Sequence, residues 1–289
     1  MLRIHVAIAT AGRAALLGET VKLMARQTRV PDGVLIVAPD MRDVGDLGTG
    51  AIRPEVAISE RGLCRQRNHA LDLLRNRADI VLFLDDDFVA APDYIAQLER
   101  LFLDHPDVVG ATGLLIADGV RKGGYSLEES LALIDREAAT MDTGISERLS
   151  LYGCNMALRM SHTAGLRFDE ALPLYGWQED VDFTTQLARR GRLVCSGRIT
   201  GVHMGTKNGR SPGRRLGYSQ IANIIYLKRK GTLPPRLGER LLLQNIIANI
   251  VRAPFPEPHI DRVGRLKGNL QAFGDLLRGR LDPRRIEQF

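Results

Sequence analysis

Three consecutive aspartates, Asp85, Asp86 and Asp87, stand directly after the apolar run Ile80–Leu84. Carboxylates this close repel one another and raise each other's pKa unless a cation lies among them. In an extended segment residues i and i+2 point the same way, so we expect Asp85 and Asp87 to face one ligand while Asp86 turns aside. Carboxylate oxygens suit Mg²⁺ or Mn²⁺, which also bind substrate phosphates. The triplet alone leaves a solvated acidic turn as an equal alternative.

A second acidic pair and a histidine could belong to the same site. Glu179 and Asp180, in the stretch GWQEDVDF, stand at an expected helix start, where backbone N–H groups favour the ionised carboxylate. The pair is ordinary helix capping unless it lies in a cleft, where a carboxylate can act as a general base on a hydroxyl. His203 ends an expected strand and is either structural or a further metal ligand. Trp177, the single tryptophan, is either half-buried packing or a platform for a sugar.

The first third of the chain alternates strands with helices. The hydrophobic pattern predicts strands at 4–8, 34–40 and 80–84 and helices at 17–24, 61–76 and 92–102. This alternation predicts an α/β sheet with right-handed crossovers, in which ligands bind beyond the carboxyl ends of the strands. Thr10, Asp40 and the three aspartates stand at those ends, so we expect them to share one cleft.

The second half of the chain is more mixed. The pattern predicts strands at 108–116, 151–160 and 192–205 and helices at 127–140 and 179–190. After Thr206 the stretch KNGRSPGRRLGYSQ is basic and rich in turn residues. Arg214 and Arg215 within it are expected on a solvated face, with phosphate binding by a basic loop as the alternative.

A helical tail, about 216–289, is interrupted by prolines near 234 and 254–258. Its apolar residues recur at helical spacing, as at Leu241, Ile246 and Ile250, with arginines and lysines between them. Such a pattern can lie in a membrane interface with its basic residues near anionic lipid. The alternative is a helical unit that packs on the rest of the chain or on a second copy of it.

Composition limits the classes of partner. The 289 residues carry a net charge of +6, which favours anionic partners: nucleic acid, acidic lipid or phosphorylated small molecules. Acidic clusters in the cleft argue against nucleic acid, because they repel phosphates unless a metal intervenes. Three cysteines without paired spacing argue against a disulfide framework or a zinc site. No apolar run approaches the ~18 residues of a membrane span and no signal peptide is evident, so we expect a cytoplasmic protein, open to peripheral contact with the inner membrane face.

Seven stretches occur in the order found in family 2 glycosyltransferases, which the chain resembles over about residues 3–207. They are VAIATAGR, IVAPD, RGLCRQRNHAL, VLFLDDDFVAAPDYI, YGCNMALRM, GWQEDVDFTTQLARRG and GVHMG. The resemblance implies a GT-A fold, a Rossmann-like mixed sheet flanked by helices, for residues 1–210, with a helical extension over 211–289. It also implies a nucleotide-diphospho-sugar donor, a divalent cation (Mn²⁺ or Mg²⁺) and inverting transfer to the hydroxyl of a saccharide or lipid-linked saccharide. Surface polysaccharide or glycolipid synthesis is the implied setting.

The resemblance assigns roles by position. Those implied for the nucleotide are Thr10, Arg13, Asp40, Arg67, Asn68, Asp85 and Asp86. Those implied for the metal are Asp85, Asp87 and His203, while Asp180 matches the catalytic base, and Trp177 and Glu179 lie by the acceptor. Two departures leave the base and the donor open: the first strand lacks the usual Pro-Thr pair, and a single acid, Asp40, ends the second.

Two other functions remain open at this stage. A nucleotidyltransferase that makes sugar nucleotides can use a similar fold, but it usually carries a Gly-rich, basic loop after the first strand. Only Ala11-Gly12-Arg13 stands at that place. A non-catalytic module that binds nucleotide is the third alternative. Transfer of a sugar, release of pyrophosphate or binding alone would separate the three.

Overall fold

The computed structural model describes residues 1–47, 50–206, 212–255 and 257–289. Within them one mixed sheet has the order β3-β2-β1-β4-β8-β6-β9-β5, with β7 beside β9. Residues 48–49, residues 207–211 of the basic stretch and residue 256 lie outside the described part of the chain. The strands are β1 (Ile4–Ala9), β2 (Gly33–Ala38), β3 (Glu55–Ile58), β4 (Ile80–Asp85), β5 (Phe88–Ala90), β6 (Val108–Asp118), β7 (Ile145–Glu147), β8 (Asn155–Arg159) and β9 (Arg192–His203). The helices are α1 (Ala14–Met24), α2 (Met41–Val44), α3 (Leu63–Leu74), α4 (Tyr94–Asp104), α5 (Leu127–Glu137), α6 (Glu179–Leu187), α7 (Gly213–Lys230), α8 (Pro235–Arg252) and α9 (Arg262–Leu277).

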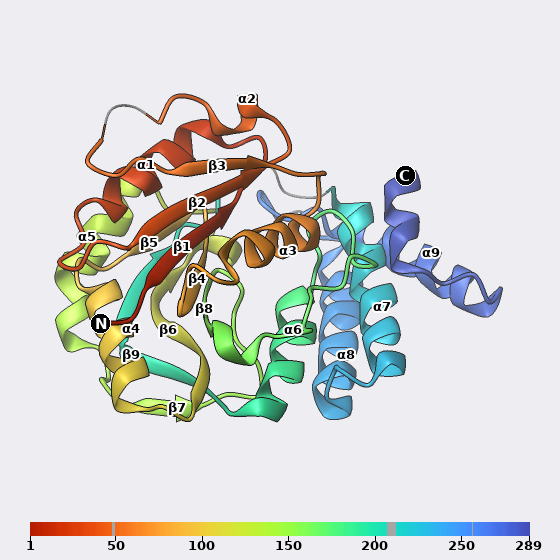
Figure 1. Ribbon diagram of the computed structural model, residues 1–289. Coiled ribbons are helices and arrows are strands. Elements are labelled where there is room, and N and C mark those ends of the chain that lie inside the picture. The colour runs from red at the N-terminus through yellow and green to blue at the C-terminus, as the bar shows by residue number, and fades with distance from the viewer. Residues whose placement is uncertain (48–49, 207–211, 256) are drawn as a thin grey trace.

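The central strands are buried on both faces, as their continuous apolar runs predict. Alternate residues of β4 enter two different cores: Leu82 lies with α1 and α4, whereas Phe83 lies with α3, α6 and α7. Figure 1 shows this arrangement, with α3 in front of the sheet and the blue C-terminal helices at its side. The two cores fix the register of β4, because a shift by one residue would exchange its two faces. The position of Asp85 at the end of β4 is fixed with it.

The first four strands are parallel, and the later strands make the sheet mixed. β4 pairs in parallel with β1, and β1 with β2, which confirms the predicted α/β arrangement. β8 runs antiparallel between β4 and β6, while β6 and β9 are parallel. In this register His203 of β9 lies beside Asp118 of β6 on one side and Phe88 of β5 on the other. The β4–β5 turn, and the aspartates in it, therefore meet the end of β9.

The C-terminal helices pack on the side of the sheet that α3 and α6 cover. Ile224 and Leu227 of α7 enter the same core as α3 and α6. α9 crosses α7 at two glycines, and a Cβ on Gly217 would lie 2.0 Å from the carbonyl oxygen of Arg265. Only glycine allows the two backbones to approach this closely. The inner faces of the C-terminal helices thus pack on the rest of the chain, as the second of the two alternatives for the tail predicts. No helix among the described residues is long and apolar enough to cross a membrane.

Candidate active site

A cleft of about 610 Å³ opens at the carboxyl ends of the central strands. Its walls come from the ends of β1, β4 and β9, the start of α3, the loop before α6 and the first turn of α7. The lining includes most of the side chains that the sequence singled out, namely Thr10, Arg13, Arg67, Asp85, Trp177, Glu179, Asp180 and His203. Arg215 of α7 also lines it. Segments far apart in the sequence therefore meet where the α/β topology predicts a ligand.

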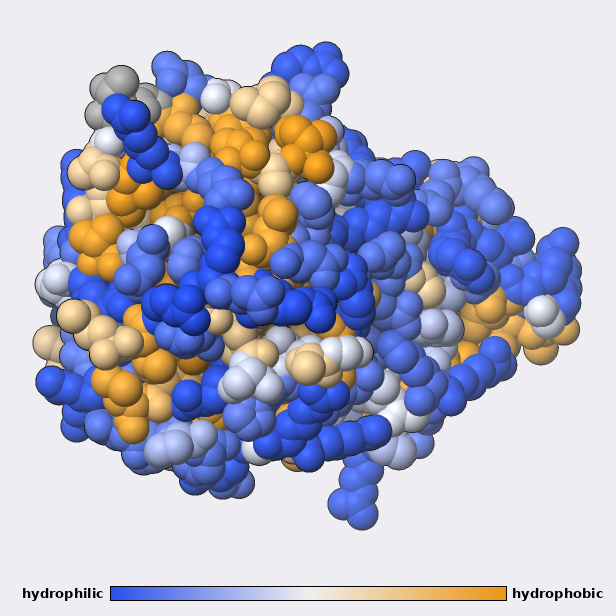
Figure 2. Space-filling view, viewed as in Figure 1, coloured by the Kyte–Doolittle hydropathy of each residue, from blue (hydrophilic) through white to orange (hydrophobic). Residues whose placement is uncertain are grey.

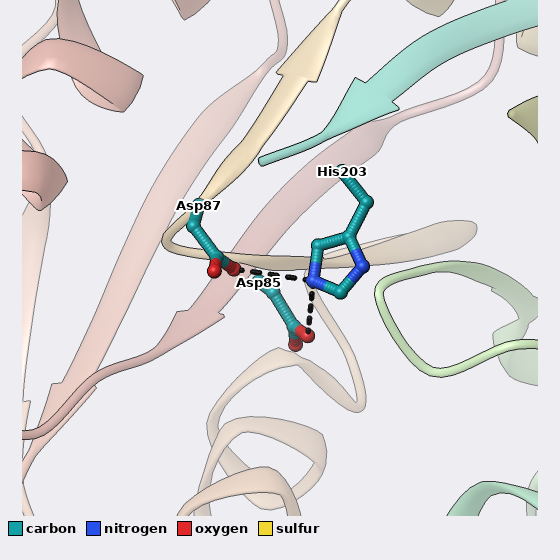
Figure 3. A group of neighbouring side chains, drawn as sticks. All are labelled: Asp85, Asp87 and His203. Atoms are coloured by element: carbon teal, nitrogen blue, oxygen red, sulfur yellow. Dashed lines mark ion pairs between the residues drawn. The ribbon is translucent and has the colours of Figure 1, made fainter. Parts of the chain in front are cut away.

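Asp85, Asp87 and His203 offer one ligand atom each, and these atoms lie within 4.8 Å of one another. Figure 3 shows the two carboxylates turned toward the same imidazole nitrogen. His203 Nε2 lies 3.4 Å from Asp87 Oδ1 and 3.9 Å from Asp85 Oδ2. The i and i+2 aspartates thus face one point, as their spacing predicts.

The protonation state of this cluster follows from its hydrogen bonds. Burial would lower the pKa of His203, but its hydrogen bonds with Asp118 and Asp87 outweigh burial and raise that pKa to about 10. Burial alone would raise the pKa of Asp87, but His203, Arg13 and the backbone N–H of Thr206 hold it below the usual range. Without a metal the imidazolium therefore serves as the local cation among the carboxylates.

The donor set fits a hard divalent cation. Two carboxylates and one imidazole are suitable ligands for Mn²⁺, and Mg²⁺ also accepts the carboxylates. His203 Nδ1 lies 3.1 Å from Asp118 Oδ1, which leaves Nε2 directed at the two aspartates. A carboxylate on the far nitrogen of a ligating histidine fixes its orientation and raises its basicity. Metal binding at Nε2 would release the imidazolium proton.

Asp86 is turned away from this cluster, as its spacing predicts. The residue is fully buried, accepts a hydrogen bond of 2.6 Å from the Thr10 hydroxyl, and lies 2.9 Å from Arg13 Nη2. Burial raises the pKa of Asp86 to about 7, although Arg13 acts against the rise. Arg13 also lies 3.2 Å from Asp87 Oδ2, so one guanidinium bridges two neighbouring aspartates. Asp86 thereby holds Arg13 and Thr10 in place beneath the cleft.

Glu179 and Asp180 begin α6 after a strained turn in which Leu174, Gly176 and Gln178 have positive φ angles. Asp180 accepts hydrogen bonds from the backbone N–H groups of Gly153 (2.9 Å) and Val181 (2.8 Å), which favour its ionised form. Burial raises the pKa of Asp180, and burial together with Asp180 raises that of Glu179 to about 8. Of the two, Asp180 is the carboxylate better suited to accept a proton.

Arg67 of α3 joins the group of Asp85, Asp87 and His203 to the acidic pair Glu179 and Asp180. Its guanidinium is almost wholly buried, lies 3.3 Å from Asp85 Oδ1 and forms an ion pair with Glu179. It also donates a 2.8 Å hydrogen bond to the carbonyl of Gly153, whose N–H holds Asp180. A Cβ on Gly153 would lie 3.1 Å from Arg67 Nη1 and 3.2 Å from Asp180 Cβ. Glycine at this position therefore lets the network close.

Several known proteins are similar to this chain in sequence or in fold. Residues 53–168 match the family described as glycosyl transferase family 2. Over that segment, which is less than half of its length, the chain is similar to family 2 glycosyltransferases. A glucosyl-dolichyl phosphate glucuronosyltransferase of Haloferax volcanii is 27% identical over 150 residues, a match that covers 49% of this chain and 47% of that protein. The match thus spans about half of the relative's length.

Solved structures with the GT-A fold resemble most of this chain in fold. GalNAc-T7 with UDP, GalNAc and Mn²⁺ superposes with a TM-score of 0.56 at 14% identity, over 89% of this chain and 58% of that one. S. aureus TarS 1-349 gives 0.56 at 14% identity, over 97% and 82%. The mannosyltransferase PcManGT from Pyrobaculum calidifontis, in complex with GDP-Man and Mn²⁺, gives 0.51 at 16%, over 96% and 80%. At these identities the likeness establishes the fold.

Three residues that were expected to contact the nucleotide do not line the cleft. Asp40 caps α2 by accepting the backbone N–H of Arg42 (2.8 Å), and its carboxylate pairs with the Arg42 guanidinium. The Asn68 amide is buried and bound to both backbone polar groups of Phe168. Asp86 is directed inward as described above. Each is occupied by a structural contact that the family's motif spacing does not reveal.

Trp177 is half-buried at the cleft and packs against the core shared by α3, α6 and α7. Its carbonyl accepts a 2.8 Å hydrogen bond from Asn223 of α7. Both alternatives for Trp177 thus keep a physical basis, because the residue packs against this core and also lines the cleft. Arg215 lines the cleft, whereas Arg214 lies over the Phe289 ring at 5.1 Å.

The sequence reasoning missed Asp118 and Tyr152. Asp118 ends β6 and binds His203, and the Tyr152 hydroxyl lies 3.3 Å from Asp118 Oδ2 and 3.4 Å from His203 Nδ1. One signal was available: Asp118 follows the strand-like run 108–116, and a strand end is where the α/β topology places ligand-binding residues. The pairing of β6 with β9 was not predicted, so nothing connected Asp118 with His203.

Proposed function

We propose that the protein is a metal-dependent glycosyltransferase that moves a sugar from a nucleotide-diphospho-sugar to an acceptor hydroxyl with inversion. One observation carries the proposal: Asp85 and His203, which form a candidate ligand set with Asp87, line the same cleft as the backbone-held carboxylate of Asp180. The family match supports glycosyl transfer, and the complexes of two structural relatives with Mn²⁺ and a nucleotide or nucleotide sugar support the donor class.

The chemistry requires one base and no protein nucleophile. Asp180 takes the proton of the acceptor hydroxyl while that oxygen bonds to the anomeric carbon of the donor. The bond from that carbon to the diphosphate oxygen breaks on the opposite face, so a single displacement inverts the centre. A divalent cation at Asp85, Asp87 and His203 would neutralise the negative charge of the nucleoside diphosphate. Arg67 holds Asp85 and Glu179 in register for this step.

The acceptor is proposed to be a saccharide or a lipid-linked saccharide in surface polysaccharide or glycolipid synthesis at the cytoplasmic face of a membrane. The name of the Haloferax volcanii relative, which includes a dolichyl phosphate, supports a lipid-linked acceptor. Trp177 lies at the cleft beside Glu179 and Asp180 and would present an apolar ring to a sugar face.

A thermal-shift screen of nucleoside diphosphates, each with and without Mn²⁺, tests the donor class. A bound ligand raises apparent stability by mass action, so the stabilising base names the donor nucleotide. The matching nucleotide sugars are then incubated with model acceptors, and NMR of the product gives its anomeric configuration. We expect an inverted glycoside. Pyrophosphate release would instead indicate a nucleotidyltransferase, and binding without turnover of any sugar would indicate a binding module.

A further inference from the structure

Helix α8 carries apolar side chains on two opposite faces. Its inner face, which includes Leu237, Leu241 and Leu242, packs against the cores of the sheet side and of the C-terminal helices. Its outer face is also apolar and exposed, with Leu243 58%, Ile247 56%, Ile250 53% and Val251 59% accessible. A surface helix of a soluble protein normally opposes its apolar stripe with polar residues. The outer face of α8 therefore has the composition of a contact surface.

Spacing places the exposed residues of α8 on one stripe. Steps of three and four residues connect Leu243, Ile247, Ile250 and Val251, and Phe255, 70% exposed, follows just beyond the helix. The same steps, counted backwards, place the exposed Arg236 and Arg240 at the N-terminal end of the stripe. We call these seven residues the α8 outer face. It combines a continuous apolar band with two arginines at one end.

Helix α9 repeats the pattern. Val263, Leu270 and Leu277 recur every seven residues and are 49%, 64% and 88% exposed, with the exposed Lys267 between them. Figure 2 shows apolar residues, bordered by hydrophilic ones, at the right-hand end of the molecule over the region that Figure 1 labels α9. Two neighbouring helices of the same extension thus expose apolar residues beside basic ones.

The charge of the extension identifies the partner. From residue 235 to the end, ten arginines and lysines stand against six aspartates and glutamates, so this part holds +4 of the chain's +6. Its acids are largely engaged: Glu239 pairs with Lys228, Glu257 with Arg262, and Asp275 with Arg285. Among the described residues, none forms an ion pair with Arg236, Arg240 or Lys267. The uncompensated charge next to the apolar stripes is positive.

We propose that the α8 outer face docks on an anionic lipid surface, with its apolar band in the interface and Arg236 and Arg240 at the headgroups. A two-fold contact between copies would bring this face against itself, and with it two segments of net charge +4 that repel each other. Anionic headgroups complement the same charge. The surface is independent of the proposed reaction, because neither donor nor acceptor is needed for it to bind.

Co-sedimentation with vesicles tests the proposal on the full chain. Vesicles of phosphatidylglycerol and phosphatidylcholine are compared with vesicles of phosphatidylcholine alone at low salt. We expect binding to the anionic vesicles and at least about tenfold weaker binding to the neutral ones, because each arginine near an anionic surface favours binding. Arg236→Gln/Arg240→Gln should lower binding to anionic vesicles about tenfold, and added salt should weaken the wild type more than this variant.

The apolar band is tested by Leu243→Gln/Ile247→Gln/Val251→Gln, which keeps helix propensity and should weaken binding about 100-fold. The matched control is Val30→Gln/Leu103→Gln/Leu149→Gln, at apolar residues 48%, 52% and 72% exposed outside the extension, and it should bind like wild type. Far-UV circular dichroism checks that both variants fold; if the α8 variant unfolds, the arginine variant decides alone.

Three results would overturn the proposal. The first is a wild type that does not bind anionic vesicles at low salt. The second is a control variant that loses as much vesicle binding as the α8 variant. The third concerns oligomeric state. If light scattering finds a dimer that the α8 variant converts to a monomer, and neither protein binds vesicles, the α8 outer face is an interface between two copies.

Discussion

The cleft and the helical extension depart from ordinary burial in opposite directions. At the cleft and directly behind its wall, charged side chains are buried: Arg67, Asp86 and Asp87 are 2%, 0% and 3% exposed. On the α8 outer face apolar side chains are outside, as with Ile247 at 56% and Phe255 at 70%. Both buried charges and exposed apolar side chains lower the stability of the isolated protein, and each is offset by a different kind of contact. Buried charges need partners or a ligand, whereas exposed apolar residues need a surface.

The buried charges at the cleft are compensated by other side chains of the same chain. Each buried carboxylate there has a cation or a hydrogen-bond donor beside it, through Arg13, Arg67 or His203. Among the described residues, none covers the exposed apolar side chains of the α8 outer face. The difference indicates that the cleft is pre-organised for its ligand, whereas the extension is incomplete until it meets a partner. Substitutions in one region should therefore leave the activity of the other intact.

The largest effect is expected at Asp180. Asp180→Asn keeps the size of the side chain but cannot accept the acceptor's proton, so turnover should fall about 10²–10⁴-fold with donor binding retained. Steady-state kinetics with the donor identified by the screen measures this. Asp104→Asn, on the exposed end of α4, is the control. Near-normal turnover of Asp180→Asn would assign the base to another residue, with Glu179 or Asp182 next to test.

The pH dependence of turnover is a second test of Asp180 as the general base. Burial raises the pKa of Asp180, so its carboxylate is lost at a higher pH than an ordinary aspartate's as the solution is acidified. Turnover should fall with decreasing pH, starting above the usual aspartate range near 3.9. A turnover rate that stays constant down to pH 4 would contradict this assignment.

Arg67 should matter most for stability. Arg67→Met leaves Glu179 and Asp85 without their shared cation, and breaking a buried pair costs about 3–5 kcal/mol. Arg75→Met is the matched control on the same helix, because Arg75 pairs with Asp72 at the surface, where the loss is about 0–1 kcal/mol. Urea unfolding measures both. Equal losses for the two variants would mean that Arg67 does not connect the metal cluster to the acidic pair.

Local pattern predicted the strands and helices whose residues face a buried sheet, and it placed the aspartates at the end of β4. It also predicted that Asp85 and Asp87 point the same way, because that depends only on the two-residue period of extended chain, and both carboxylates do lie near His203 Nε2. The short strands β3, β5 and β7, of three or four residues, were missed. Segments that short contain too few residues for a period to appear.

Contacts across the sheet could not be predicted from local pattern. The inward turn of Asn68 depends on Phe168, 100 residues away, and the His203–Asp118 contact spans 85 residues. The role of Arg67 likewise depends on Gly153 and Glu179, which the fold brings to it. The sequence identified residues whose side chains could bind a ligand or transfer a proton. Contacts between distant segments of the fold decide which of these residues face the cleft.

Replacement of Asp118 should lower the affinity for Mn²⁺ by an intermediate factor. Asp118→Asn keeps a hydrogen-bond acceptor for His203 but removes the charge that makes the imidazole more basic. Loss of such a partner typically lowers metal affinity about 10–100-fold, and we expect the lower part of that range. Mn²⁺ titration by calorimetry measures it, with Asp104→Asn again as the control. An unchanged Mn²⁺ affinity would leave Asp118 a purely structural partner.

The smallest expected effect is that of the α8 substitutions on nucleotide binding, which tests whether the cleft and the helical extension act independently. Leu243→Gln/Ile247→Gln/Val251→Gln should leave Mn²⁺-dependent binding of the nucleoside diphosphate within about twofold of wild type, because additivity holds for distant sites. Calorimetry with the nucleotide found in the screen measures this. A loss of nucleotide affinity as large as the loss of vesicle binding would show that the two regions are coupled.

The central claim is that Asp85, Asp87 and His203 hold the cation on which donor binding depends. Electron paramagnetic resonance of free Mn²⁺, titrated with protein and the nucleoside diphosphate, measures the cation directly. The account predicts one bound Mn²⁺ per chain, at least about tenfold weaker Mn²⁺ binding in Asp87→Asn and His203→Ala, and no nucleotide affinity in excess chelator. Equal Mn²⁺ affinity in wild type and both variants, or full nucleotide affinity with chelator, would contradict it.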